Sequence, residues 1–347
     1  MTAKKRVLYF DLLNIVACIC VVALHCNQMV HTWMPGKNWA AGLIIEDVCY
    51  WAVPVFFMLT GATLIRYRER YDTKTFLIKR FQRTVIPFLF WSAVLYFYIV
   101  IYRDGNAFGP RRMINAILNN EIEQVYWFFF PLFSVYLALP ALSLLSDNKK
   151  ALTYMAGVSF LLVSVLPFAC SAIGISWPGS ISIPICGGML MFVIIGYLLS
   201  ETNIPKRTRM IIYALGIASM LFRYTYTYIS SNALGYVDRT YFDYIAFPSV
   251  FLGVAVFVFF KHSDTTRLEP SQKQLAKLSG CSFGVYLIHK PILDYVIMDA
   301  LGVPMTSVLL RTIGVIILYL ACVLLVLLLK KDPGSARNCT LGVRLTV

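Results

Sequence analysis

Long apolar runs, each close to the length of one membrane crossing, recur along the chain. A helix needs roughly 20 apolar residues to cross a hydrocarbon core of about 30 Å, and only helices or closed barrels satisfy their backbone groups there. The pattern predicts an all-α, polytopic membrane bundle of about ten transmembrane helices. The expected spans are residues 7–27, 41–65, 84–102, 125–145, 152–169, 182–200, 210–229, 242–260, 280–300 and 304–329.

The segments between these spans differ in charge, and the difference predicts an orientation. Lys and Arg near span ends are held on the cytoplasmic side of a membrane. An N-in, C-in arrangement puts most of them there, with a large cluster in the 66–83 loop. We expect residues 1–332 to form the membrane domain and residues 333–347 a short cytoplasmic tail. The outer loops then hold only Lys37, Arg103, Arg111, Arg112 and Arg239.

The composition agrees with a membrane location and argues against nucleic-acid binding and a metal site. The chain is 59% hydrophobic and 14% charged, against roughly 25% charged in ordinary soluble domains. Its formal net charge of +14 is dispersed between spans rather than gathered on one folded face, so we expect no nucleic-acid partner. The 9 cysteines lie mostly inside spans and show neither a metal-ligand spacing nor a disulfide framework. We interpret them as small buried residues and expect no metal site.

A stripe of polar residues runs along the first span, "YFDLLNIVACICVVALHCNQ". A helix turns about 100° per residue, so Asp11, Asn14 and Gln28 all lie within about 60° of His25 around the axis. Taken alone, His25 could be an ordinary interfacial histidine. Ionisable groups exposed to lipid cost several kcal/mol, so an aligned stripe usually faces a wet cavity or the bundle interior. The stripe therefore favours a functional role for His25. Asp11 lies about 21 Å from it along the axis, too far for a hydrogen bond.

Four short motifs follow one another along the chain: the first span with Asp11 and His25, "VPVFFMLTGATLI" with Thr60-Gly61, "FLIKRFQRTVIPF" with Arg80 and Arg83, and "SFGVYLIHKPIL" with His289 two residues before Pro291. Together and in this order they resemble the acyltransferase 3 family of bacterial membrane O-acyltransferases. Asn14 stands where many members of that family have arginine. "EQVYWFFFPLFSVYLALP" (123–140) is also similar to the family's fourth-span region, more weakly.

The resemblance implies an acyl-CoA donor on the cytoplasmic side and a hydroxyl acceptor, usually on a carbohydrate, on the outer side of a bacterial cell membrane. Acetyl-CoA is the expected donor. Arg80 and Arg83 fall one turn apart at the inner side, where guanidinium groups can hold phosphates by charge-assisted hydrogen bonds. Lys79 and Asn14 complete the expected CoA-binding set. The alternative is that the arginines only anchor the topology.

His25 is the expected general base, because imidazole titrates close to neutral pH and can take the proton of an attacking hydroxyl. The resemblance also places Asp11 among the catalytic residues. Glu46 and Asp47, at the outer start of the second span, are candidates for the group that fixes the tautomer of His25. They could equally be ordinary interfacial acids. No spacing requires a covalent acyl-enzyme.

Five further residues are expected to contact the substrates. His289 precedes a proline that can expose backbone carbonyls to a cavity, so it could shape the acyl tunnel or the acceptor site, or simply be a packed histidine. Arg223 lies near the outer third of a span and needs an anionic partner. The expected substrate-binding residues are His289, Tyr286, Trp127, Arg223 and Thr60.

The alternative function is a transporter or exporter of a glycan or lipid-linked sugar. Such proteins often contain paired half-molecule repeats with matching Gly or Pro interruptions. Here Pro54, Pro140, Pro167 and Pro291 do not fall in equivalent halves, which favours the acyltransferase.

Overall fold

The computed structural model describes residues 6–105, 107–178, 181 and 186–331, so the expected tail, residues 333–347, lies outside the described residues. All regular structure in these ranges is helical, and none of it is strand. The prediction of an all-α fold is confirmed.

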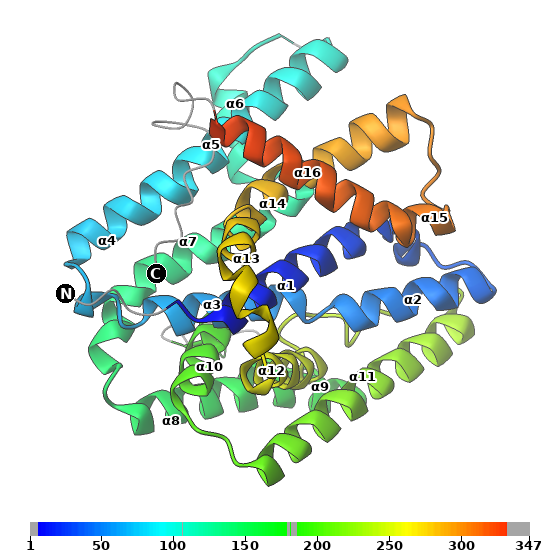
Figure 1. Ribbon diagram of the computed structural model, residues 1–347. Helices are drawn as coiled ribbons and strands as arrows, with labels where there is room; N and C mark the ends of the chain where they lie inside the picture. Colours follow the sequence, from blue (N-terminus) through cyan, green and yellow to red (C-terminus); the bar gives the residue numbers. More distant parts are fainter. Residues whose placement is uncertain (1–5, 106, 179–180, 182–185, 332–347) are drawn as a thin grey trace.

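The described residues form a bundle of sixteen α-helices, whose arrangement is shown in Figure 1. They are α1 Leu8–Cys26, α2 Lys37–Cys49, α3 Ala52–Leu64, α4 Thr73–Arg80, α5 Ile86–Tyr96, α6 Pro110–Leu118, α7 Phe129–Leu142, α8 Lys149–Ser159, α9 Leu166–Ala172, α10 Met189–Glu201, α11 Lys206–Leu234, α12 Phe247–His262, α13 Gln272–Ser279, α14 Ser282–Pro291, α15 Val308–Arg311 and α16 Ile313–Lys331.

Shorter helical turns join or extend these helices. Four of them are π-helical and continue an α-helix without a break, which keeps long apolar helices intact. The others are 3-10 turns. In chain order the set is η1 Gln28–His31, η2 Tyr67–Glu69, η3 Phe81–Val85, η4 Phe97–Arg103, η5 Gln124–Phe128, η6 Ser143–Leu145, η7 Phe160–Val165, η8 Thr266–Ser271 and η9 Ile292–Ala300.

Helix α1 is the centre of the bundle. It contacts α2, α3, α12, α13, α14 and α16, and it runs through the middle of the molecule in Figure 1. Its apolar side chains Leu13, Ala17 and Val22 are fully buried. A helix that packs on most sides has no lipid-facing surface for polar groups to occupy, so its polar stripe must be satisfied by neighbouring helices.

Helices α3 and α10 pack with their backbones in direct contact. A Cβ atom added to Gly61 would lie 1.8 Å from the carbonyl oxygen of Val193, and one added to Gly196 would lie 2.1 Å from that of Met58. Small residues allow this approach, a common device between membrane helices. The contact explains the glycine of the Thr60-Gly61 motif and fixes the position of Thr60 beside it.

Within the part of the chain that the structure describes, six helical segments are long and apolar enough to cross a membrane. A seventh is reached if α12 and the following 266–279 segment, which are bent by 88°, count as one span. The six are Leu8–Cys26, Lys37–Glu69, Thr73–Arg103, Gln124–Leu145, Lys149–Ala172 and Ile313–Lys330.

The other four expected spans coincide with helices that are shorter or more polar. Helix α10 has 13 residues and α12 has 16, about 20 and 24 Å at 1.5 Å per residue. The expected 280–300 span is a continuous helix formed by α14 and η9, but it carries the charged residues Lys290, Asp294 and Asp299. Helix α11 has 29 residues but carries Arg223 and several hydroxyls. The count of ten spans and the N-in, C-in orientation stay predictions.

The α3–α10 contact predicts the effect of a single methyl group. We expect Gly61→Ala to lower the free energy of unfolding by about 3 kcal/mol or more, since the new Cβ meets backbone that cannot rotate away. Gly157→Ala in α8 is the matched control, because its Cβ would meet nothing within 4 Å and alanine favours helix. Thermal unfolding in detergent measures both variants, and equal midpoints would contradict the close approach.

Candidate active site

A cavity of about 260 Å³ lies between the first half of α1 and helices α3, α4, α7 and α14. Its apolar wall includes Phe56, Leu59, Phe128 and Leu132. The cavity also gathers seven of the residues predicted from the sequence, which come from four separate segments of the chain. These are Asp11, Asn14, Thr60, Lys79, Arg80, Arg83 and Tyr286.

The cavity is strongly cationic. The only acid among its described lining residues is Asp11, which pairs with Arg6 through two contacts of 2.6 Å. Four further cations have no acidic neighbour in the lining, so the potential inside is positive, and low-dielectric walls strengthen it. The basic lining residues are Arg6, Arg70, Lys79, Arg80 and Arg83.

Aromatic rings hold two of these cations in place. The Lys79 ammonium lies 4.0 Å from the centroid of the Tyr71 ring, and the Arg80 guanidinium lies 5.7 Å and 5.8 Å from those of Phe76 and Tyr136. Arg80 Nε is buried and has no protein hydrogen-bond partner. A buried donor without an acceptor is costly, so this guanidinium is suited to an anionic ligand.

The polar stripe of α1 is satisfied by α13 and α14, which run alongside it. The side-chain amide of Asn14 donates to the backbone carbonyl of Ser279 at 2.9 Å and contacts the Ser279 and Ser282 hydroxyls at 2.9 and 3.1 Å. Farther along, Gln28 donates to Asp294 at 3.3 Å. The stripe therefore faces the bundle interior, as expected from its alignment.

His25 meets His289 near the C-terminal ends of α1 and α14. Its Nδ1 lies 2.6 Å from Nε2 of His289, and the two rings are stacked with centroids 4.9 Å apart. His289 is fully buried, whereas His25 is half-buried. Two expected residues that are 264 positions apart in the sequence thus form one hydrogen-bonded pair, which is called the histidine dyad below.

Tyr286 separates the dyad from the cavity. It lines the cavity, and its ring centroid lies 5.7 Å from that of His289. Its hydroxyl donates to the backbone carbonyl of Val125, while the Tyr126 hydroxyl donates to that of Leu287 at 2.8 Å. This reciprocal pair ties α14 to η5 and holds the dyad one side chain beyond the cavity wall.

A second polar cluster lies on the other side of the dyad from the cavity. Lys290 pairs with Asp294, which also accepts from Gln28. Glu123, just before η5, is buried, and burial raises its pKa to about 7 although nearby Lys290 opposes the shift. These side chains supply donors and acceptors beyond the dyad.

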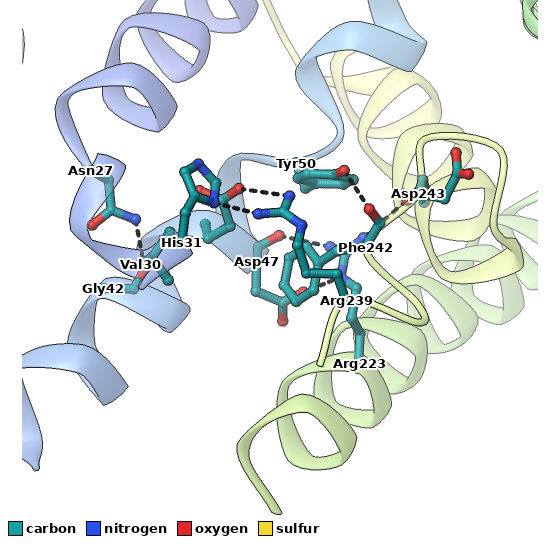
Figure 2. A network of polar contacts seen from close by, with 12 residues as sticks. Asn27, Val30, His31, Gly42, Asp47, Tyr50, Arg223, Arg239, Phe242 and Asp243 are labelled. Atoms are coloured by element: carbon teal, nitrogen blue, oxygen red, sulfur yellow. Dashed lines mark hydrogen bonds and ion pairs between the residues drawn. The ribbon is translucent and has the colours of Figure 1, made fainter. Parts of the chain in front are cut away.

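Glu46 and Asp47 do not contact the dyad in this structure. Asp47 forms an ion pair with Arg223, whose side chain is 0% exposed and also donates to Ser249 and to the Asp47 carbonyl (Figure 2). Glu46 lies 3.9 Å from Arg239. Arg223 therefore has the anionic partner that its position requires. The ion pair joins α2 to α11, and the hydrogen bond to Ser249 adds α12.

The structure separates the expected residues into three places. The cavity holds seven of them, and the dyad holds His25 and His289. Glu46 and Asp47 form ion pairs with Arg239 and Arg223. Trp127 lies outside these three places, is half-buried and stacks on Tyr244 with centroids 5.4 Å apart. Trp127 and Arg223 are not among the residues that line the cavity.

Sequence reasoning missed several residues of the site. No local sequence pattern identifies Ser279 and Ser282 as site residues, because they reach Asn14 only when α13 and α14 pack against α1. Tyr71 and Tyr136 resemble any interfacial aromatic residues. The sequence shows Arg6 only as one of the basic residues before the first span, and its pairing with Asp11 becomes evident in the structure. Within the described residues, no group of three or more His, Cys, Asp or Glu side chains is arranged to hold a metal ion.

The fold and the site define a bundle of apolar helices whose interior holds a cationic cavity next to a histidine dyad. A family model described as an acyltransferase domain matches residues 7–330. The chain therefore belongs to the acyltransferase 3 family and is a multi-pass membrane acyltransferase. Comparisons with curated proteins and with solved structures find no match.

The Arg223–Asp47 pair predicts a strong coupling in stability. We expect Asp47→Leu and Arg223→Met each to lower the free energy of unfolding by about 3–5 kcal/mol, because either change leaves a buried charge without its partner. The double variant should lose less than either single variant. Arg239→Ala, at a side chain 42% exposed, is the control and should change stability by about 1 kcal/mol or less. Additive losses in thermal unfolding would contradict the coupling.

Proposed function

We propose that this acyltransferase moves an acyl group, most simply acetyl, from cytoplasmic acyl-CoA to a hydroxyl of an extracytoplasmic carbohydrate, in the cytoplasmic membrane of a bacterium. The observation that carries the proposal is the cationic cavity, which ends one side chain from the histidine dyad. The family assignment favours this function over export of a glycan or lipid-linked sugar.

The cavity suits both the phosphate groups of acyl-CoA and the arm that carries its thioester. Arg80 and Arg83 supply the planar donors that match phosphate oxygens, and Lys79 adds a flexible positive charge. The apolar wall suits the uncharged arm that carries the thioester. About 16 Å of helix rise separates Asn14 in the cavity from His25 in the dyad. That separation favours a ligand with a charged head and a long flexible arm.

The proposed orientation follows from the same residues. The basic cavity is lined by the start of α1 and by the 66–83 segment, which the charge distribution assigns to the cytoplasmic side. Acyl-CoA would therefore enter from the cytoplasm, and the acceptor would approach the dyad from the opposite side. The acyl group would cross the membrane while CoA stays on one side of it.

The proposed reaction is a direct acyl transfer. The acceptor oxygen gives its proton to His25 as it attacks the thioester carbonyl, and a C–O bond forms. The C–S bond then breaks, and the departing thiolate takes the proton from the imidazolium. The products are an ester and free CoA thiol. No covalent acyl-enzyme is required, and His25 returns to its starting state.

The general-base role of His25 predicts a loss of turnover without a loss of donor binding. We expect His25→Ala to lower the acetyl-CoA-dependent transfer rate by roughly 10²- to 10⁴-fold, while the affinity for CoA stays unchanged, because His25 does not line the cavity. Thiol release with glycan acceptors measures the rate, and calorimetry with CoA measures the affinity. Full activity in this variant would refute the catalytic assignment.

The proposed contacts of Arg80 and Arg83 with the CoA phosphates predict a loss of donor binding. We expect Arg80→Ala and Arg83→Ala each to weaken CoA binding by roughly 10- to 100-fold, since a hydrogen bond to a charged group contributes about 1.5–3 kcal/mol. Arg207→Ala, at an exposed residue of α11 outside the cavity, is the matched control for loss of one basic charge. If all three variants bind CoA equally well, the arginines are only topology anchors.

A further inference from the structure

The hydrogen bonds of His289 fix the position of its proton. Its Nδ1 lies 3.0 Å from the carbonyl oxygen of Val285 and 2.8 Å from that of Tyr286. Carbonyl oxygens only accept hydrogen bonds, so Nδ1 must carry the hydrogen. In neutral His289 the other ring nitrogen, Nε2, is then an acceptor with a free lone pair.

The short contact within the dyad fixes the proton of His25 in turn. His289 Nε2 lies 2.6 Å from His25 Nδ1, a distance at which two lone pairs would repel each other. One hydrogen must therefore lie between them, and in the neutral dyad it belongs to His25 Nδ1. The remaining nitrogen, Nε2 of His25, is left unprotonated.

We propose that His289 is a positioning residue that holds His25 in the tautomer whose Nε2 is free to accept a proton. The inference rests on the proposed role of His25 as general base and adds the group that sets its tautomer. The sequence suggested Glu46 or Asp47 for this task, but these acids are engaged by Arg239 and Arg223.

The positions of the hydrogens in the neutral dyad also determine which nitrogen accepts the next proton. In the neutral dyad, His289 Nδ1 is protonated, one hydrogen bridges the two rings, and only His25 Nε2 is vacant. A proton taken from the acceptor hydroxyl therefore binds His25 Nε2. The bridging hydrogen can then lie closer to either ring, so that both imidazoles share the positive charge. The proton returns from His25 Nε2 to the departing thiolate.

A histidine suits this position better than a carboxylate. His289 is 0% exposed, and an ionised acid at such a site would need a permanent cationic partner to offset its desolvation. Neutral imidazole accepts the hydrogen bond without bringing a charge into the bundle. The orientation of its ring is set by two backbone carbonyls and by the packing of Tyr286.

Two substitutions separate the two hydrogen bonds of His289. The side-chain amide of glutamine reaches the depth of Nε2, so H289Q keeps an acceptor for His25 Nδ1–H but loses the backbone anchor. Asparagine is shorter, so H289N keeps a donor for the carbonyls but loses the acceptor. We expect H289N to lower kcat on the order of 10²-fold with little change in KM for acetyl-CoA. H289Q should retain most of the activity.

The tautomer itself can be measured without activity. The protein has four histidines, and ¹⁵N-histidine labelling in nanodiscs distinguishes protonated from unprotonated ring nitrogens. The H25A variant assigns the His25 signals. We expect wild-type His25 to have protonated Nδ1 and unprotonated Nε2, and H289N to shift it toward the opposite tautomer.

The measurements test the positioning role of His289 and the catalytic role of His25 separately. A protonated Nε2 in neutral wild-type His25, or equal kcat in H289N and H289Q, would overturn the positioning role. Full activity in H25A would instead overturn the proposed function, while the tautomer measurement would still report whether His289 sets the state of His25. Thermal unfolding of both His289 variants checks that a lower kcat does not come from loss of folded protein.

Discussion

The structure depends on one constraint, which is that the polar side of α1 must find all of its partners inside the bundle. Neither lipid nor an apolar core can satisfy these groups. Helices α13 and α14 provide the partners in the order of the stripe, from Ser279 and Ser282 opposite Asn14 to His289 opposite His25. Matching donors and acceptors over this length fixes the register of the first span against a late one.

That register brings the two parts of the site together. The basic end of α1 faces the cavity, where Arg80 and Arg83 project from the helix that leads into the third expected span. Farther along, the same helix presents His25 to His289. The Gly61 contact with α10 places Thr60 on the cavity wall from a third direction. Helix α1 thus contributes side chains both to the cationic cavity and to the dyad, and so it fixes their relative positions.

Helical periodicity was enough to predict which face of α1 is polar, because Asp11, Asn14 and His25 are related by the turn of a single helix. It could not identify their partners. Asn14 and Ser279 are separated by 265 positions, and His25 and His289 by 264. Such pairs follow from packing rather than from local pattern. The same limit explains Asp47, which has Arg223 on α11 as its partner, 176 positions away.

The order of charge along α1 follows the energetic cost of burial. The fully charged pair, Arg6 with Asp11, lies at the end of the helix, where Arg6 is 26% exposed. Neutral Asn14 and Cys18 come next, and the dyad follows near the other end of the helix, where His289 is 0% exposed. A group buried in this way has to be neutral at rest, since an isolated buried charge is strongly unfavourable. It also has to accept a proton during an acyl transfer. Imidazole satisfies both demands, which accounts for histidine at both positions of the pair.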